Sequence, residues 1–459
     1  MILNIDNLGI VKSARIDFSK KLLLFCGRNS TGKTYVSYIL HAFLTDGKVF
    51  KLNSAENIAR QILENRSFQI EKKYIDEWLS MNCQEVMNQL GSVFAISDST
   101  KEKLFSEFNL SVDFSDNDYQ DTIANTVINA QMNDGQLVWK IEKEAGDRQV
   151  RVECNVDDSS IMTPDSFRLA NLLCNVFRNL TLGKDSGVRM LTVERNSIYT
   201  FKTELSLSRN ELIDRIQAQS GKSELDIFDI INSSSRRYPL AVRSSLRVAN
   251  DLENVQKAES PYAEVSRQIE EDILGGEVSM TKNGDVEFRA KNMLKSKRLP
   301  FHLSSSIVKT MASLVIYLRH MARPSDTLII DEPEMNFHPD VQVVLARIFA
   351  ILVNKGLKVI VSTHSDYIVR EFNNLIMAGA IAAKGDMDTV SMLDYTSDML
   401  IRKDELSVLL FKLVKKNTVN TASLEIDDEG FAVESIDDTI QKQNVAAETL
   451  YAKLYCDKR

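Results

Sequence analysis

Acidic residues gather directly after an apolar run in the stretch "LIIDEPEMNFHP" at 328–339. The run 327–330 is typical of a buried strand, and Asp331, Glu332 and Glu334 follow it closely. Carboxylates at this spacing repel one another, and a divalent cation would offset the repulsion. Taken alone, the segment also fits a strand that ends in an acidic surface turn. A second motif has to decide between a metal site and a turn.

A glycine-rich loop near the N-terminus favours the metal site. The segment "GRNSTGKT" matches the pattern GxxxxGK[ST] at full spacing, between an apolar run at 22–26 and a potential helix at 35–43. Glycines let backbone N–H groups turn inward around phosphate oxygens, and a helix N-terminus adds partial positive charge. The alternative is a glycine turn that carries a solvated lysine. We expect a nucleoside triphosphate to bind the residues Gly27, Arg28, Asn29, Ser30, Thr31, Gly32, Lys33 and Thr34.

Together the two segments predict a site for phosphoryl transfer. Lys33 would reach the β- and γ-phosphates, and the Thr34 hydroxyl would ligate Mg²⁺. Asp331 stands where a Walker B aspartate would hold Mg²⁺ through its water shell. Glu332 is the candidate general base for the attacking water.

A histidine follows the next apolar run along the chain. The run 358–362 predicts a strand, and His364 in "STHSD" would lie at its carboxyl end, where ligands of open α/β sheets bind. A neutral imidazole there can donate a hydrogen bond to the γ-phosphate. A lone histidine is more often structural, but the order lysine, acidic pair, histidine favours the functional interpretation.

A serine run lies before the acidic strand. Ser304, Ser305 and Ser306 can cap a helix whose apolar face is formed by Ile307, Met311, Leu314 and Leu318. One interpretation is an ordinary serine N-cap. The other is an exposed, positively polarised helix end that meets a γ-phosphate held by another subunit.

Composition limits the class of protein. The 459 residues leave room for two or three domains, and the formal net charge of -8 argues against a polycation that is drawn to nucleic acid. Five cysteines without CxxC spacing argue against a disulfide framework or a zinc site. The first residues lack the pattern of a signal peptide, and the longest apolar run, 375–383, is too short to span a bilayer. We expect a soluble cytoplasmic protein without membrane partners.

In this order the motifs resemble those of ABC-type, SMC-like ATPases: Walker A "GRNSTGKT", a long insertion, signature "LSSS", Walker B "LIIDE", D-loop "EMNFHPD" and switch histidine "STHSD". The stretches "DEPEMNFHP" and "VERNSIYTF" (193–201) resemble the OLD-like branch of AAA ATPases. That branch includes ATPase subunits of two-gene bacterial antiphage systems such as PARIS and Septu. The resemblance covers about 1–45 and 185–400.

The resemblance implies a fold, cofactors and an assembly. The fold would be an α/β P-loop ATPase head of the ABC type, with a mixed and largely parallel central sheet, an N-terminal antiparallel subsheet and an α+β insertion. ATP and Mg²⁺ would lie between two heads of a homo-oligomer, a head-to-tail dimer or an assembly of such dimers. Ser304 would then act in trans on the partner's nucleotide. The usual signature has glycine after this serine, whereas Ser305 and Ser306 stand here. The chain offers no glutamine for the Q-loop, where Glu194 or Arg195 is the candidate.

Patterning divides the chain into three parts. The head would comprise 1–48 and 185–400, the insertion 49–184, and a C-terminal appendage 401–459. In the insertion we expect a helix with Ile75, Leu79, Val86 and Leu90 on one face, a hairpin turn at 133–135 and a helix at 165–182. A second hairpin is expected at 283–285. Sustained heptads are absent, which argues against a long coiled-coil arm. In the appendage we expect strands at 408–414, 424–427 and 431–434, then a helix.

Three functions remain open. The first is a regulatory ATPase of an antiphage system that controls a separate effector, expected to be a Toprim or other nuclease, with a phage protein as a candidate trigger. The alternative is a DNA-repair clamp of the RecF type, in which Arg236, Arg237, Arg243 and Arg247 grip duplex DNA. A self-contained Toprim nuclease would need a glutamate beside the "DMD" at 386–388. The nearest upstream acid, Glu371, falls in an expected helix, so we expect no nuclease activity of its own.

Overall fold

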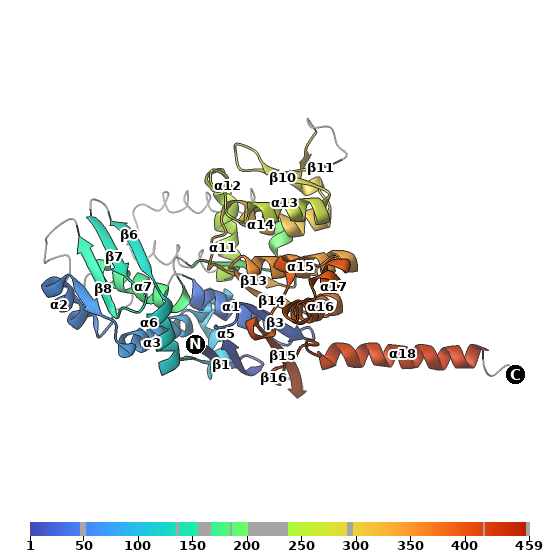
Figure 1. Cartoon of the computed structure of the whole chain (residues 1–459), viewed down its shortest axis with the longest axis horizontal. Coiled ribbons are helices and arrows are strands. Elements are labelled where there is room, and N and C mark those ends of the chain that lie inside the picture. Colours follow the sequence, from blue (N-terminus) through green and yellow to red (C-terminus); the bar gives the residue numbers. More distant parts are fainter. Residues whose placement is uncertain are drawn as a thin grey trace.

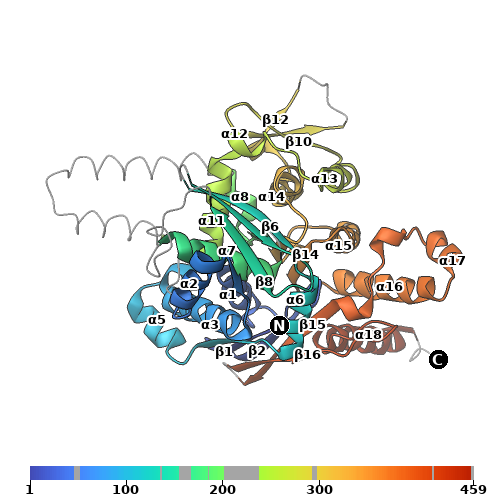
Figure 2. The same ribbon diagram turned by 60° about the vertical axis from the view of Figure 1, so that its left-hand side comes forward.

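The structure is a computed structural model that describes residues 1–45, 52–134, 137–154, 167–183, 186–200, 237–291, 297–415 and 418–455. Figure 1 shows a body built on a large sheet, with helices on both faces of it. Figures 1 and 2 both place a smaller lobe, which contains β10, α12 and α13, above this body.

Nine strands of the described residues form the main sheet, in the order β5-β1-β2-β16-β15-β3-β14-β13-β9. Strands β15, β3, β14, β13 and β9 are parallel neighbours, whereas β1 pairs antiparallel with both β2 and β5. The sheet confirms the predicted fold class, a mixed and largely parallel sheet with an N-terminal antiparallel subsheet. The bounds are β1 Ile2–Leu8, β2 Val11–Asp17, β3 Leu22–Gly27, β5 Asn109–Asp113, β9 Val188–Leu191, β13 Thr327–Asp331, β14 Lys358–Thr363, β15 Leu406–Lys415 and β16 Thr418–Ser423.

The central strands are apolar throughout because both faces of the sheet are covered. Leu23 and Phe25 of β3 belong to a core that includes residues of α1 (Lys33–Leu44) and α3 (Lys72–Asn88). Leu22 and Leu24 point to the opposite core, beneath α14 (Ser306–His320), α15 (Pro339–Asn354) and α16 (Asp366–Ala383). Successive side chains of β3 therefore pack into two cores, one on each face of the sheet, and both cores hold the carboxyl end of the strand in place.

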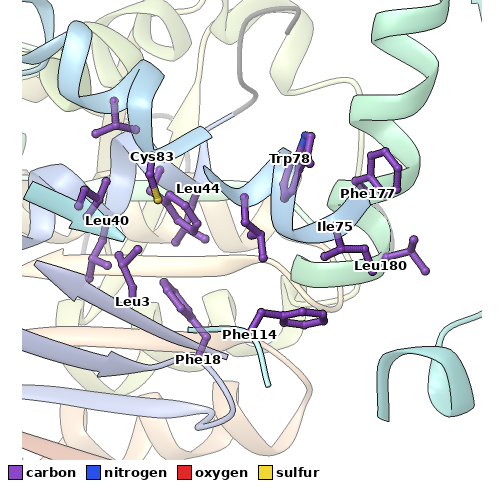
Figure 3. Close-up of a cluster of buried hydrophobic side chains, with 14 of the residues drawn as sticks. Leu3, Phe18, Leu40, Leu44, Ile75, Trp78, Cys83, Phe114, Phe177 and Leu180 are labelled. Atoms are coloured by element: carbon purple, nitrogen blue, oxygen red, sulfur yellow. The ribbon is translucent and has the colours of Figure 1, made fainter. Parts of the chain in front are cut away.

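The insertion is an α+β unit, as predicted. Its four-stranded sheet has the order β4-β8-β7-β6, and the side chains of α3 and α7 gather in the core that Figure 3 shows, among them Trp78 and Phe177. β5 lies within 49–184 but extends the main sheet as its edge strand. The predicted helix at 165–182 is described from Phe167, and Gly135 of the predicted hairpin lies outside the described residues. The elements are α2 Ala55–Asn65, β4 Ser67–Gln69, α4 Leu90–Phe94, α5 Asp98–Phe105, α6 Asp116–Asn125, β6 Ile128–Asp134, β7 Leu137–Lys143, β8 Gln149–Cys154 and α7 Phe167–Leu182.

The lobe above the body precedes the serine run at 304–306 in the chain. The hairpin predicted at 283–285 is confirmed by the antiparallel pair β10 and β11. The lobe and its connections contain α8 Arg195–Ile198, α11 Leu240–Asn250, α12 Leu252–Val255, α13 Ala263–Ile269, a π-helix at Glu270–Leu274, β10 Gly276–Met280, β11 Val286–Ala290 and β12 Leu299–Pro300.

The C-terminal part differs from the prediction. The expected appendage at 401–459 supplies two internal strands, because β15 pairs with β3 and β16 pairs with β2. The strands predicted at 424–427 and 431–434 are wrong: Asp427 and Gly430 form only an isolated bridge. Phe431 and Val433 are buried in the second core, so their alternating pattern reflects burial without a partner strand. α17 (Met387–Met392) precedes this part, and α18 (Glu434–Tyr455) projects away from the body in Figure 1.

No helix in the described ranges combines the length and the apolarity needed to cross a bilayer.

Candidate functional site

The glycine-rich loop joins β3 to α1 as the sequence predicts. Gly27 has φ 141°, and a Cβ on it would lie 2.6 Å from the carbonyl oxygen of Phe411. Gly32 has φ 90°, and its Cβ would meet Val11 Cγ2 at 2.4 Å. Both positions therefore require glycine. No side chain caps α1 and its first turn contains no acidic residue, so the first N–H groups remain available to an anion.

Lys33 lies across the inside of this loop. Its Nζ donates hydrogen bonds of 2.9 Å to the carbonyl oxygens of Gly27 and Arg28. Burial lowers the pKa of Lys33, and the nearby carboxylates of Glu332 and Asp331 counteract that effect. The ammonium group therefore lies between the loop and the acidic strand end, where a nucleotide's terminal phosphates would fit.

Asp331 connects the acidic strand to α1. Its side chain is 0% exposed, yet Thr34 Oγ1 donates a hydrogen bond of 2.7 Å to Asp331 Oδ2. The Ser362 hydroxyl of β14 donates to Oδ1. Burial raises the pKa of Asp331, whereas these two hydrogen bonds lower it. A hydroxyl and a carboxylate within one hydrogen bond of each other are the oxygen ligands that Mg²⁺ prefers, so Thr34 and Asp331 fit the ion.

Glu332 is held in an unusual backbone conformation. Its φ is +46°, in the left-handed region that a residue with a Cβ rarely occupies. Its N–H donates to the carbonyl oxygen of Ser362 at 3.0 Å, and its own carbonyl accepts from Arg195 Nη2 at 2.7 Å. Arg195 Nη1 donates to the carbonyl of Asp331 at 2.7 Å. The Glu332 side chain is 30% exposed, which leaves the carboxylate in contact with solvent.

His364 follows β14 and faces the acidic segment. Glu334 is buried, and its Oε1 accepts hydrogen bonds from the Thr363 hydroxyl at 2.9 Å and the His364 N–H at 2.8 Å. His364 Nδ1 lies 3.5 Å from the same oxygen and 4.0 Å from Glu332 Oε1. This histidine therefore stands beside the candidate base.

The serine run begins α14, but no serine hydroxyl caps the helix. Within the ranges that the structure describes, Ser305 occupies the N-cap position without a side-chain hydrogen bond, and the buried Ser304 Oγ has no hydrogen-bond partner. Met311, Leu314 and Leu318 are buried as predicted, and Ile307 is partly buried. In the described part of the chain, no hydrogen bond joins the start of α14 to the phosphate loop of the same chain. Ser304 in trans therefore stays a prediction.

Three polar contacts were not assigned from the sequence. Arg195 was only a candidate for the Q-loop, whereas its guanidinium holds two backbone carbonyls of the acidic segment. Glu334 lies in the acidic segment and Ser362 in the strand before His364. Their only sequence signal was that they are close in the chain to Asp331 and His364, respectively. Glu194, the other Q-loop candidate, is exposed.

One of the four arginines considered for DNA binding and one aspartate of the "DMD" run at 386–388 form hydrogen bonds within the fold. Arg243 donates to the carbonyl and the hydroxyl oxygen of Ser92 at 2.9 and 2.7 Å, so it packs α11 against the insertion. Arg237 and Arg247 are exposed, and Arg236 lies outside the described residues. Asp386 caps α17, and buried Glu371 is paired with Arg347.

Comparison with known proteins gives one family match. Residues 1–369 match the protein family described as AAA ATPase domain. No curated protein matches the chain.

Among solved structures, the chain is similar to heads of SMC proteins. One is the Smc head domain with an extended coiled coil, bound to the C-terminal domain of ScpA, from Pyrococcus furiosus. It has 11% identity and a TM-score of 0.36, and the match covers 96% of this chain and 98% of that chain. Another is an SmcHead bound to the C-winged helix domain of ScpA, with 12% identity, a TM-score of 0.33 and coverage of 93% and 98%. A third is the SMC head domain from Thermotoga maritima, with 10% identity, a TM-score of 0.31 and coverage of 93% and 98%.

Proposed function

Because the chain belongs to the AAA ATPase domain family, we propose that it binds and hydrolyses ATP with Mg²⁺ at the site between the glycine-rich loop and the acidic strand end. The observation that carries this proposal is the 2.7 Å contact between Thr34 Oγ1 and Asp331 Oδ2. It joins the two motifs that the chemistry needs and supports Thr34 and Asp331 as neighbouring candidate ligands of Mg²⁺.

Each residue has a role in this mechanism. The N–H groups of the loop and of the first turn of α1 would donate hydrogen bonds to the phosphate oxygens, and Lys33 would exchange its carbonyl contacts for the β- and γ-phosphates. Mg²⁺, held by Thr34 and Asp331, would neutralise charge that develops on the phosphates. Glu332 would take the proton of the attacking water, and His364 would donate to the γ-phosphate.

We further propose that the ATPase is the regulatory subunit of an antiphage system. Two chains would assemble head to tail, each placing Ser304 and the start of its α14 on the partner's nucleotide. ATP turnover would hold or release a separate effector, for which a nuclease is the expected class, in response to a phage protein. The support is the resemblance of "DEPEMNFHP" to the OLD-like branch, together with the uncapped N-terminus of α14.

Trapping the nucleotide tests the ATPase and its assembly together. Glu332→Gln should bind ATP without turnover and accumulate as dimers or larger species in mass photometry, whereas Lys33→Ala should remain in its nucleotide-free state. A Glu332→Gln chain that hydrolyses ATP at the wild-type rate would contradict the role of Glu332.

The defence role has its own test. Cells that carry the chain with its neighbouring gene should resist phage infection, and the Lys33→Ala version should not. ATP-dependent binding of duplex DNA by the isolated chain, lost when Arg237 and Arg247 are replaced, would instead support the clamp function.

A further inference from the structure

A cavity lies at the amino ends of the parallel strands, opposite the end that carries the phosphate loop. It has a volume of about 670 Å³, and its walls come from α11, α12, the C-terminal end of α14, the start of β9 and Asp326, which directly precedes β13. The phosphate loop and Asp331 stand at the carboxyl ends of β3 and β13, so this cavity is separate from the nucleotide site. Its volume is within the range of small-molecule sites, about 300–1,000 Å³.

One cationic side chain in the cavity wall has no partner among the described residues. Arg189 of β9 is only 5% exposed and lines the cavity. Its Nε is buried without a hydrogen-bond partner, and within the described ranges its guanidinium forms no ion pair or hydrogen bond. Burial lowers the pKa of Arg189, and the groups that counteract this effect are Tyr199 and Tyr317 rather than a carboxylate. A buried guanidinium without a counter-ion is costly, which is why such groups are nearly always paired.

The acidic residues of the cavity do not supply this counter-ion. Asp326 is buried but already accepts hydrogen bonds from the Gly187 N–H at 2.6 Å, the Arg323 N–H at 3.0 Å and the Tyr317 hydroxyl at 3.1 Å. Asp251 and Glu259 are exposed, at the rim of the cavity. The three carboxylates that line the cavity are therefore either hydrogen-bonded already or exposed to solvent.

We propose that this cavity binds a small oxyanion, a carboxylate- or phosphate-bearing molecule, through Arg189. The planar guanidinium can offer two parallel N–H donors to such a group. The half-buried imidazole of His320 also lines the cavity, together with apolar and aromatic side chains such as Val248 and Tyr317. The organic part of a ligand whose anionic group binds Arg189 could pack against these side chains. This site would be additional to the one that binds ATP.

Isothermal titration can test the site in a chain whose phosphate loop is weakened by Lys33→Ala, with inorganic phosphate and citrate as the two probes. We expect one of them to bind the Lys33→Ala chain. Adding Arg189→Met should weaken that binding by roughly tenfold to a hundredfold, as for the loss of hydrogen bonds to a charged group. The probe that binds distinguishes a phosphate site from a carboxylate site.

Two further variants separate binding from folding. Arg402→Met removes the same charge from the exposed surface, where Arg402 pairs with Asp404, and should leave the affinity unchanged. Ser244→Leu narrows the cavity from α11 without touching Arg189 and should also weaken binding. Equal affinities of the Lys33→Ala chain with and without Arg189→Met, or no binding of either probe, would overturn the proposal.

Discussion

The Thr34 hydroxyl donates a hydrogen bond of 2.7 Å to Asp331 Oδ2 across a separation of 297 positions in the chain. β14 lies between β3 and β13 and contributes Ser362, whose hydroxyl donates to the other carboxylate oxygen. Helix α1 and the neighbouring strands β13 and β14 thus fix one buried carboxylate at the carboxyl end of β13. Its two oxygens are oriented before any ion binds.

Removing the Thr34 hydroxyl should impair Mg²⁺ use rather than folding. Thr34→Val keeps the shape of the side chain but removes the proposed Mg²⁺ ligand and one hydrogen-bond donor to Asp331, at a cost to stability of about 1–3 kcal/mol. We expect Mg²⁺-dependent ATP hydrolysis to fall by roughly tenfold or more, with nucleotide binding in EDTA little changed. Hydrolysis rates over a Mg²⁺ titration measure this.

A matched control lies at the opposite end of the same helix. Thr45 Oγ1 donates to the carbonyl of His41 at the C-terminus of α1, so Thr45→Val removes a hydroxyl far from the acidic strand. Its Mg²⁺ dependence should equal that of the wild type. If Thr34→Val behaves in the same way, Thr34 is not a metal ligand.

Arg195 should set the position of Glu332. Its guanidinium donates to the carbonyls of Asp331 and Glu332, while the backbone of Glu332 sits at φ +46°, a conformation that costs about 1–3 kcal/mol. Arg195→Lys keeps the charge but loses the planar fork. We expect kcat to fall by about tenfold or more, with a smaller change in KM for ATP.

Two comparisons distinguish positioning from general damage. Arg347→Lys makes the same change at a half-buried arginine that pairs with Glu371 away from the site, and it should leave kcat unchanged. In a Glu332→Gln background, Arg195→Lys should cause little further loss, because the group that it positions is already inactive. A full additional loss there would assign Arg195 a role independent of Glu332.

Local sequence patterns predicted the parts of the site that lie within continuous motifs. The loop with Gly27 and Gly32, the strand that ends at Asp331 and the strand before His364 each carry their own signal of glycine spacing or apolar periodicity. Arg195 has no such signal, because its partners are backbone carbonyls 136 and 137 positions away and any residue type could supply them. Its side chain is buried, which is unusual for arginine and is visible only in the structure.

Strand order was the part of the fold that periodicity could not supply. The run that forms β15 was expected as a strand, but its place beside β3 joins Leu406 to Leu22, a pairing that depends on long-range packing. The same limit applies to β5, which leaves the insertion to pair with β1. At 431–434 a strand was predicted and none is present. Phe431 and Val433 alternate with polar or small residues because both are buried in the core, but the segment pairs with no described strand.

His41 should make folding sensitive to mild acid. It is buried on α1, and burial, aided by the charge of Arg189, lowers the pKa of its imidazole to about 3. An unfolded histidine titrates near 6.5, so the unfolded state binds a proton that the folded state rejects. The stabilising difference is complete above about pH 6.5 and is lost as the pH falls toward 3. It amounts to about 2 kcal/mol between pH 6.5 and 5.

Urea unfolding from about pH 7 to about pH 5 measures this effect. His41→Leu should flatten the decline in unfolding free energy over that window, because no group at position 41 then titrates. His302→Gln, which replaces an exposed histidine, should leave the decline intact. A His41→Leu chain with the wild-type pH profile would mean that this imidazole is protonated in the folded state.

Mixing two inactive chains should restore hydrolysis if the start of α14 acts in trans. Ser305→Glu places a negative charge at the exposed N-cap, where it suits the helix dipole but repels a partner's γ-phosphate. Lys33→Ala leaves α14 intact but disables its own loop. In a mixed dimer, the loop of the first chain and α14 of the second form one complete site. Random mixing of equal amounts should therefore give about a quarter of the wild-type sites. Hydrolysis by Ser305→Glu alone at the wild-type rate, or none in the mixture, would place all catalytic groups within one chain.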